Sequence, residues 1–363
     1  MKDTRVEERP TGVPREGAKQ VGEVRARWAW TELVVWTERM LTTLERGVKG
    51  GVWFSLIDKV YDARTLRAAW HAVWARKGAG GVDWQTVEQF AAQAEKHLEH
   101  LEEELRADAY VPKPVRRCWI EKAGSAEKRP LGIPTVKDRV VQTALRMVVE
   151  PIYEREFHPR SYGFRPGRGC KDALREVERL LNEGCTWIVD ADIKSYFDTI
   201  PRAELMTEVR KRISDGRVLR LIESYLNQGV MEGLEEWTPE AGTPQGAVIS
   251  PLLANIYLHP VDLVMDKAGY EMVRYADDLV ILCRSEAQAQ QALAELEREL
   301  RGRGLTLHPE KTRIVDATAP GGFDFLGYHF EQGQRWPREK SQRKLKDTVR
   351  QHTGRNSGVS LAV

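Results

Sequence analysis

Two adjacent aspartates between two short apolar runs constrain the fold of this chain more than any other feature. The runs Met272–Tyr275 and Leu279–Cys283 each have the length of a strand, and Ala276-Asp277-Asp278 between them is short and mostly polar. Apolar runs joined in this way predict a β-hairpin. An isolated hairpin is barely stable in water, so this one needs further strands and covering helices.

A third aspartate ends an earlier apolar run. Trp187-Ile-Val189 is predicted as a buried strand that runs into Asp190 and Asp192. If this strand neighbours the hairpin, carboxylates from both meet at one edge of the sheet. Such hard oxygen ligands suit Mg²⁺, and two ions about 4 Å apart activate an attacking hydroxyl and stabilise a leaving pyrophosphate. Taken alone, the same acids also fit a polar turn and a helix cap, and Asp190 and Asp198 compete with Asp192.

Composition narrows the class of protein. The chain has 363 residues, of which 41% are apolar and 30% charged, as expected of a globular protein. No apolar run approaches the roughly 18 residues of a membrane span, and residues 1–27 lack the apolar stretch of a secretory signal. The four cysteines have no CxxC spacing. We expect a cytoplasmic protein without disulfides, without a zinc site and without a membrane partner.

Charge is segregated although the net charge is only +2. Val111–Pro130 holds six Lys or Arg against two Glu, and Arg335–Arg355 holds eight against two acids. Basic segments of this kind neutralise phosphates along a track. An ordinary solvated surface explains them equally well on charge alone.

Two motifs resemble the metal-binding segments of reverse transcriptases. Val273-Arg-Tyr-Ala-Asp-Asp-Leu-Val280 resembles the hairpin whose Tyr-x-Asp-Asp core is diagnostic of that family. Asp192-Ile-Lys-Ser-Tyr-Phe197 resembles the first metal motif, in which an aromatic residue follows the aspartate by five positions. This spacing selects Asp192 over Asp190 and Asp198.

Further motifs follow in the order of the same family. Those of the fingers resemble bacterial group II intron-encoded reverse transcriptase/maturase proteins, and the intact Gln-Gly-x-x-x-Ser-Pro argues against diversity-generating retroelements. The matching segments are Arg129-Pro-Leu-Gly-Ile-Pro134, Ser161-Tyr-Gly-Phe-Arg-Pro-Gly167, Gly242-Thr-Pro-Gln-Gly-Ala-Val-Ile-Ser-Pro251, Leu307-His-Pro-Glu-Lys311 and Phe325-Leu-Gly-Tyr328.

The resemblance implies a role for each matching residue. Asp192, Asp277 and Asp278, with Ile193 beside them, would hold two Mg²⁺ ions, for which Mn²⁺ can substitute. Lys311 would act as a general acid toward pyrophosphate. Phe197 would exclude a 2′-hydroxyl beneath the incoming sugar. The other nucleotide contacts would be Lys122, Arg129, Gln245 and Gly246, and the template and primer contacts Arg165, Tyr275, Gly327 and Tyr328.

The resemblance also implies an architecture and partners. We expect an α+β fold with right-hand fingers and palm, in which an antiparallel sheet carries helices on one face. Residues 1–27 are expected to be disordered, 28–109 to form a helical N-terminal extension, 110–330 the fingers and palm, and 331–363 a truncated thumb or basic tail. The partners would be an RNA template, a DNA primer, dNTPs and a group II intron RNA. The sequence does not indicate an oligomeric state.

Three functions fit these expectations. The first is DNA synthesis on an RNA template. The second is a non-catalytic role in which the protein binds intron RNA and assists splicing. The third is a role in phage defence, as a domesticated reverse transcriptase that catalyses the same chemistry.

Overall fold

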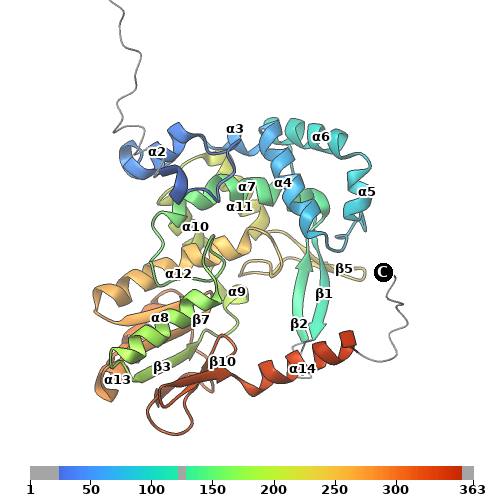
Figure 1. The fold of residues 1–363 in the computed structure, drawn as a ribbon. Coiled ribbons are helices and arrows are strands. Elements are labelled where there is room, and N and C mark those ends of the chain that lie inside the picture. The colour runs from blue at the N-terminus through green and yellow to red at the C-terminus, as the bar shows by residue number, and fades with distance from the viewer. Residues whose placement is uncertain (1–23, 122–127, 354–363) are drawn as a thin grey trace, which may run out of the picture.

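The computed structural model describes residues 24–121 and 128–353. Short helices dominate the N-terminal part and pack against a long helix, α7, from the following region (Figure 1). The helices of this part are α2 (Glu38–Arg46), α3 (Ile57–Val60), α4 (Ala63–Arg76), α5 (Val87–Ala91) and α6 (Ala94–Arg106), with a 3₁₀ turn at Lys49–Gly51. α7 spans Val136–Glu154.

The fingers are a mixed sheet in the order β2-β1-β4-β5. β1 (Val115–Glu121) pairs antiparallel with β2 (Lys128–Ile133) and parallel with β4 (Val230–Glu232), which turns back into β5 (Glu235–Trp237). β1 begins where Pro112 and Pro114 prevent a helix. Lys122, one predicted nucleotide contact, lies in the connection outside the described residues. β1 and β2 extend away from the helical end as a two-stranded arm (Figure 1).

The palm is an antiparallel sheet in the order β6-β7-β3-β8. Its strands are β3 (Trp187–Asp192), β6 (Glu271–Tyr275), β7 (Asp278–Cys283) and β8 (Arg313–Asp316). The helices of this half are α8 (Cys170–Asn182), α9 (Tyr196–Thr199), α10 (Arg202–Arg210), α11 (Gly216–Leu226), α12 (Ser250–Lys267) and α13 (Glu286–Gly302). The predicted α+β class and antiparallel palm sheet are confirmed.

The prediction that helices cover one face of the palm sheet is wrong, because helices cover both faces. Val189 and Ile281 face the main core with α12 and α13, whereas Ile188 and Val280 face a second core with α8. Consecutive residues of these strands are apolar, so neither face can remain in water. The main core is a single cluster of buried side chains, with members from Trp28 in the N-terminal part to Leu305 after α13. The N-terminal helices therefore share this core with the palm.

A small sheet and one helix follow the palm. β9 (Phe323–Phe325), β10 (Tyr328–Glu331) and β11 (Gln334–Pro337) form the sheet, and α14 (Glu339–Thr353) leads away from it. α14 buries none of its residues. No helix of the described residues has the length and apolar character needed to cross a membrane.

Candidate active site

The end of β3 and the start of β7 bring two predicted ligands together. Asp192 is the register partner of Asp278, and Asp278 is also the partner of Tyr275 across the hairpin. Directly opposed residues of antiparallel strands lie about 4.5–5.5 Å apart at Cα and project from the same face. The two carboxylates therefore stand over one edge of the palm.

The hairpin turn adds Asp277 to this edge. Ala276 precedes it with a φ of 59°, a left-handed conformation that is unfavourable for a residue with a Cβ. The loop before α8 passes close beneath the turn: a Cβ on Gly163 would lie 2.3 Å from the amide nitrogen of Ala276. Only glycine permits this approach, so the loop and the turn fit one another through the backbone.

A buried ion pair supports the turn. Arg274 is 1% exposed and donates to the carboxylate of Asp262 on α12 at 2.7 and 2.5 Å. Its Nη1 also donates to the carbonyl of Ala276 and to Oδ1 of Asn255, each at 2.9 Å. Asn255 in turn donates to the carbonyl of Gly163 at 2.8 Å. One polar network thus joins α12, the turn and the loop.

The sequence interpretation assigned no role to Arg274, although a signal for it existed. The residue lies in a strand whose neighbours Met272 and Val273 are buried. A charge in such a strand requires a buried partner, because an unpaired buried ion is very unfavourable. The signal does not identify that partner, since Asp262 and Asn255 belong to another element.

The clustered carboxylates oppose one another's ionisation. Burial raises the pKa of Asp278 to about 6, together with the charges of Asp277, Asp192 and Asp190, although Asp278 itself remains open to solvent on one side. Burial also raises the pKa of Asp277, and the charge of Asp192 adds to this shift. A divalent cation at this edge would offset the repulsion.

The donor set fits such a cation in its chemistry, because Mg²⁺ prefers carboxylate oxygens. Within residues 24–121 and 128–353, no three His, Cys, Asp or Glu side chains converge closely enough to hold an ion. Asp192 is instead engaged by a cationic side chain: its Oδ2 accepts a hydrogen bond from Lys311 Nζ at 2.8 Å. Chelation would therefore require the Asp192 carboxylate to turn from Lys311 toward Asp278.

The segment that carries Lys311 is anchored to the end of β3. The amide of His308 donates to the carbonyl of Asp192 at 2.7 Å, and Leu307 forms an isolated bridge with Ile193. Ile193 is 2% exposed, so its side chain faces the core. Backbone bonds thus place Lys311 beside the carboxylates, although it is distant in sequence.

The predicted nucleotide contacts gather where the fingers meet the palm. Phe197 lies edge-on to Phe164 with ring centroids 6.5 Å apart. Gln245 donates to Asp198 at 2.9 Å, and its carbonyl accepts from the amide of Gly132 in β2 at 2.6 Å. Gly246 takes a φ of 102°, and a Cβ there would lie 2.4 Å from the carbonyl of Gly132.

Arg129 lies on the same arm. It is exposed on β2, and its charge lowers the pKa of both Asp198 and Asp277 against the larger, raising effect of burial. The charge of Arg129 therefore acts on the carboxylates where the fingers meet the palm.

The residues predicted to contact template and primer have different environments. Arg165 is enclosed: its side chain is 2% exposed and donates to Glu154 and to the carbonyls of His158 and Ser161. No part of this guanidinium is left for nucleic acid, so any influence of Arg165 on template binding would act through the shape of its loop.

The other three lie near the palm edge or the small sheet. The nearby Cys170 thiol, together with burial, raises the pKa of Tyr275 to about 12. Gly327 takes a φ of 85° in the turn before Tyr328, and its carbonyl accepts from Arg338 at 3.0 Å and Ser341 at 2.9 Å. This turn is thereby fixed to the start of α14.

Comparison with known proteins agrees with this architecture. The sequence model described as "Reverse transcriptase (RNA-dependent DNA polymerase)" matches residues 120–330. Protein YkfC of Escherichia coli (strain K12) is 35% identical, over 84% of this chain and 90% of its own length. The group II intron-encoded protein LtrA of Lactococcus lactis subsp. cremoris is 39% identical over 53% of this chain.

The chain spans about a third of LtrA, since the match covers 32% of that protein. Among solved structures, a partial Cas6-RT-Cas1–Cas2 complex is similar at 25% identity and a TM-score of 0.43, over 68% of this chain and 41% of that one. The family match covers more than half of the chain, and the expected resemblance to group II intron proteins is confirmed. The chain therefore belongs to the reverse transcriptase (RNA-dependent DNA polymerase) family, with group II intron-encoded proteins among its relatives.

Proposed function

We propose that this protein is an RNA-directed DNA polymerase. In the reaction, the 3′-hydroxyl of a DNA primer forms a bond to the α-phosphorus of a dNTP, the bond to the β-phosphate oxygen breaks, and pyrophosphate leaves. The observation that supports the proposal is the register pairing of Asp192 with Asp278, the residue next to Asp277 in the sequence. Family membership alone does not establish activity, because function depends on the site rather than on the fold.

The proposed cofactors are two Mg²⁺ ions held by Asp192, Asp277 and Asp278, with Ile193 beside them. When bound, such ions activate the attacking hydroxyl and stabilise the leaving oxygen. Lys311 is placed to give a proton to pyrophosphate, because its ammonium already lies at this edge. A proton donor is needed there, since the leaving group gains negative charge.

The remaining roles concern the nucleotide and the strands. Phe197 would close the space beneath the sugar, and Gln245 and Gly246 would support the new base pair. Arg129 would bind triphosphate oxygens with its planar fork. Gly327 and Tyr328 would hold the primer, because their turn is fixed between the palm and α14.

Incorporation of deoxynucleotides on a primed RNA template with Mg²⁺ tests the activity. The Asp277→Ala variant removes one ligand, and Asp58→Ala on the exposed surface of α3 serves as a matched control. We expect incorporation by the wild type and by Asp58→Ala but not by Asp277→Ala. Equal incorporation by the two variants would falsify the proposal.

Binding of intron RNA is a second candidate, favoured by the similarity to LtrA, which is described as group II intron-encoded. Structured RNA is recognised by shape, phosphates and stacking, none of which needs the three carboxylates. In this case Asp277→Ala would leave both the affinity for the RNA and its splicing unchanged. Measuring splicing with this variant separates the two functions.

A further inference from the structure

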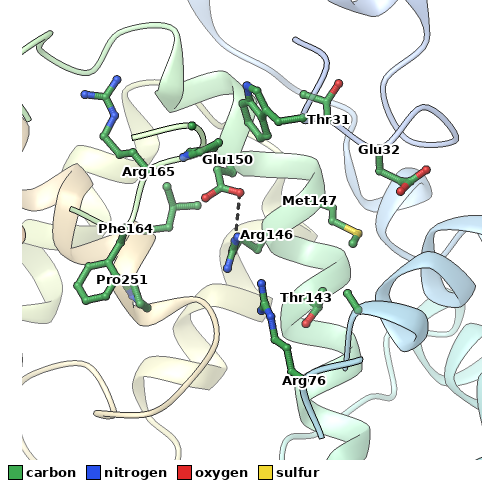
Figure 2. A pocket seen from close by; sticks show the side chains of 15 residues that line it. Thr31, Glu32, Arg76, Thr143, Arg146, Met147, Glu150, Phe164, Arg165 and Pro251 are labelled. Carbon is green, nitrogen blue, oxygen red and sulfur yellow. Dashed lines mark hydrogen bonds and ion pairs between the residues drawn. The ribbon is translucent and has the colours of Figure 1, made fainter. Parts of the chain in front are cut away.

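A hollow of about 480 Å³ lies beside the candidate active site, at the junction of several elements. Its walls come from the N-terminal segment, α4, α7, the loop before α8 and the start of α12 (Figure 2). Phe164 belongs to this wall and also contacts Phe197, the predicted gate residue, edge-on. Phe164 therefore lies between the hollow and the predicted nucleotide site. Of the predicted site residues only Arg165, whose guanidinium is already paired with Glu154, lines the hollow.

Two arginines bring positive charge into the hollow. Arg146 on α7 uses only its Nε, which donates to Glu150 Oε2 at 3.0 Å. Arg76 at the end of α4 is exposed and reaches toward Arg146 (Figure 2). Within the described part of the chain, no hydrogen bond or ion pair engages the Arg76 guanidinium or the two Nη groups of Arg146. These groups are free to bind oxygen acceptors of a ligand.

Glu150 contributes an acceptor between them. The residue is 6% exposed, and burial raises the pKa of its carboxyl against the lowering charges of Arg146 and Arg76. Only Oε2 is engaged by Arg146, and among the described residues Oε1 accepts no hydrogen bond. Because Glu150 lines the hollow, this oxygen can accept a hydrogen bond from a hydroxyl or amino group of a ligand.

Aromatic surface completes the hollow. Phe164 is 51% exposed and Trp30 is 36% exposed, and Pro251 adds apolar surface next to Phe164. Exposed rings beside arginines are the usual platform for unpaired nucleobases. Arg165 also lines the hollow, but its charge is offset by Glu154. The charges of Arg76 and Arg146 are nearly offset by Glu150 and Glu32, which favours a nucleoside unit over a phosphate group alone.

We propose that this hollow binds one ribonucleotide of the template strand, with its base against Phe164 and its 2′-hydroxyl donating to Glu150 Oε1. The inference rests on the proposed polymerase function. Of the three nucleic-acid ligands of that reaction, only the RNA template carries 2′-hydroxyls. Glu150 thus acts as a specificity-determining residue that favours RNA over DNA templates.

The position of the hollow agrees with this assignment. The primer-grip turn at Gly327 is fixed to α14, and these elements lie at the opposite end of the palm from α4 and α7 (Figure 1). A strand in the hollow is therefore not the strand held at Gly327. Its neighbour across Phe164 is the nucleotide site, where the template base must pair.

A scan of single 2′-deoxy substitutions in the template tests the proposal directly. An RNA template annealed to a DNA primer carries one deoxynucleotide, placed in turn at each position around the primer terminus. Affinity is measured by fluorescence anisotropy, which requires no polymerisation. We expect one position at which the substitution weakens binding about tenfold, since a hydrogen bond to a carboxylate is lost.

The same scan with Glu150→Ala is the decisive comparison. This variant should bind the all-RNA template about as weakly as the wild type binds the sensitive deoxy template, and it should no longer respond to that substitution. Glu102→Ala is the matched control, because Glu102 also pairs with an arginine one helical turn away in sequence but lies on the surface of α6. A flat scan in the wild type, or a sensitive position that persists in Glu150→Ala, overturns the inference.

Arg76→Ala keeps the proposal testable if Glu150→Ala fails to fold, because Arg76 is exposed. Losing one cation from the strand path should reduce the slope of log affinity against log salt by about one. Arg39→Ala, which removes an exposed arginine on α2, should not change the slope. Equal slopes for both variants contradict the assignment. Template binding without incorporation would instead refute the polymerase function and leave this inference standing.

Discussion

Lys311 Nζ lies 2.8 Å from Asp192 Oδ2, although the two residues are separated by 119 positions. Both were predicted as site residues, for different tasks: Asp192 as a metal ligand and Lys311 as a proton donor. Their contact means that the ammonium occupies one oxygen of the carboxylate that a cation would need. Lys311 and the cation therefore compete for Asp192. Removing Lys311 should thus favour cation binding but slow the reaction.

Lys311→Met is expected to lower the Mg²⁺ concentration that gives half-maximal incorporation, because the competing ammonium is gone. It is also expected to lower the maximal rate about 100-fold, because a general acid is lost. A Mg²⁺ titration of primer extension measures both quantities.

The control for this variant removes a similar cation beside an acid that is not a predicted ligand. Arg313 donates to Asp190 at 3.3 Å on the neighbouring strand. Arg313→Met should change neither the Mg²⁺ requirement nor the maximal rate. A higher Mg²⁺ requirement together with an unchanged rate in Lys311→Met would contradict both assigned roles.

The raised pKa of Asp278 predicts how stability depends on pH when no metal is present. The folded pKa of about 6 lies above the ordinary aspartate value of 3.8, so the folded state binds more protons than the unfolded state between these values. Stability must then fall as pH rises through this window and remain lower above it. Asp278→Asn removes the effect.

Without metal, Asp278→Asn should be more stable than the wild type at pH 7.5, by about 1 kcal/mol after allowance for solvent screening of this exposed residue. The difference should vanish near pH 4. Urea unfolding at several pH values measures it, with Asp58→Asn as the surface control. Added Mg²⁺ should stabilise the wild type more than Asp278→Asn. A difference that does not depend on pH would show that repulsion among the acids is not its cause.

Local patterns predicted much of the fold. β3 spans Trp187–Asp192 and β7 ends at Cys283, as the apolar runs indicated, because strand limits depend on nearby polar turns. The number of helical layers did not follow from the same runs. A run such as Ile188-Val189 is apolar on both faces, and which helix covers each face depends on distant segments.

In the candidate active site, too, local motifs predicted some features, whereas others depend on contacts between distant elements. The three aspartates were identified from the resemblance of their segments to reverse transcriptase motifs, and the register of β3 and β7 brings Asp192 and Asp278 together. The enclosure of Arg165 was not foreseen, because its partner Glu154 belongs to α7 and not to the motif. Contacts between elements determine whether a motif residue faces a ligand or the interior.

The Arg274–Asp262 pair allows stability to be separated from the positioning of the turn. Arg274→Ala leaves Asp262 buried without its partner and should destabilise the protein by about 3–5 kcal/mol. The double variant Arg274→Met with Asp262→Leu removes both charges and should recover most of this loss. It still lacks the donor to the Ala276 carbonyl, so we expect a stable protein with little incorporation.

Urea unfolding and primer extension together check this prediction. Arg298→Ala, which breaks an exposed pair with Glu295 on α13, controls for the loss of an arginine and should change both measurements little. If the double variant were both stable and fully active, Arg274 would stabilise the palm without positioning the turn.

Gly163→Ala tests whether the loop before α8 holds the turn at Ala276 in position. The added Cβ would meet the backbone of Ala276 at 2.3 Å, a contact that no rotation of a side chain relieves. Either the loop or the turn must move, and a displacement near 1 Å at reacting groups costs about 100-fold in rate. We expect a folded protein whose maximal incorporation rate falls by about that factor. Gly302→Ala, at the end of α13 with open space around it, should retain full activity. Equal rates for the two variants would mean that the loop does not hold Asp277 in place.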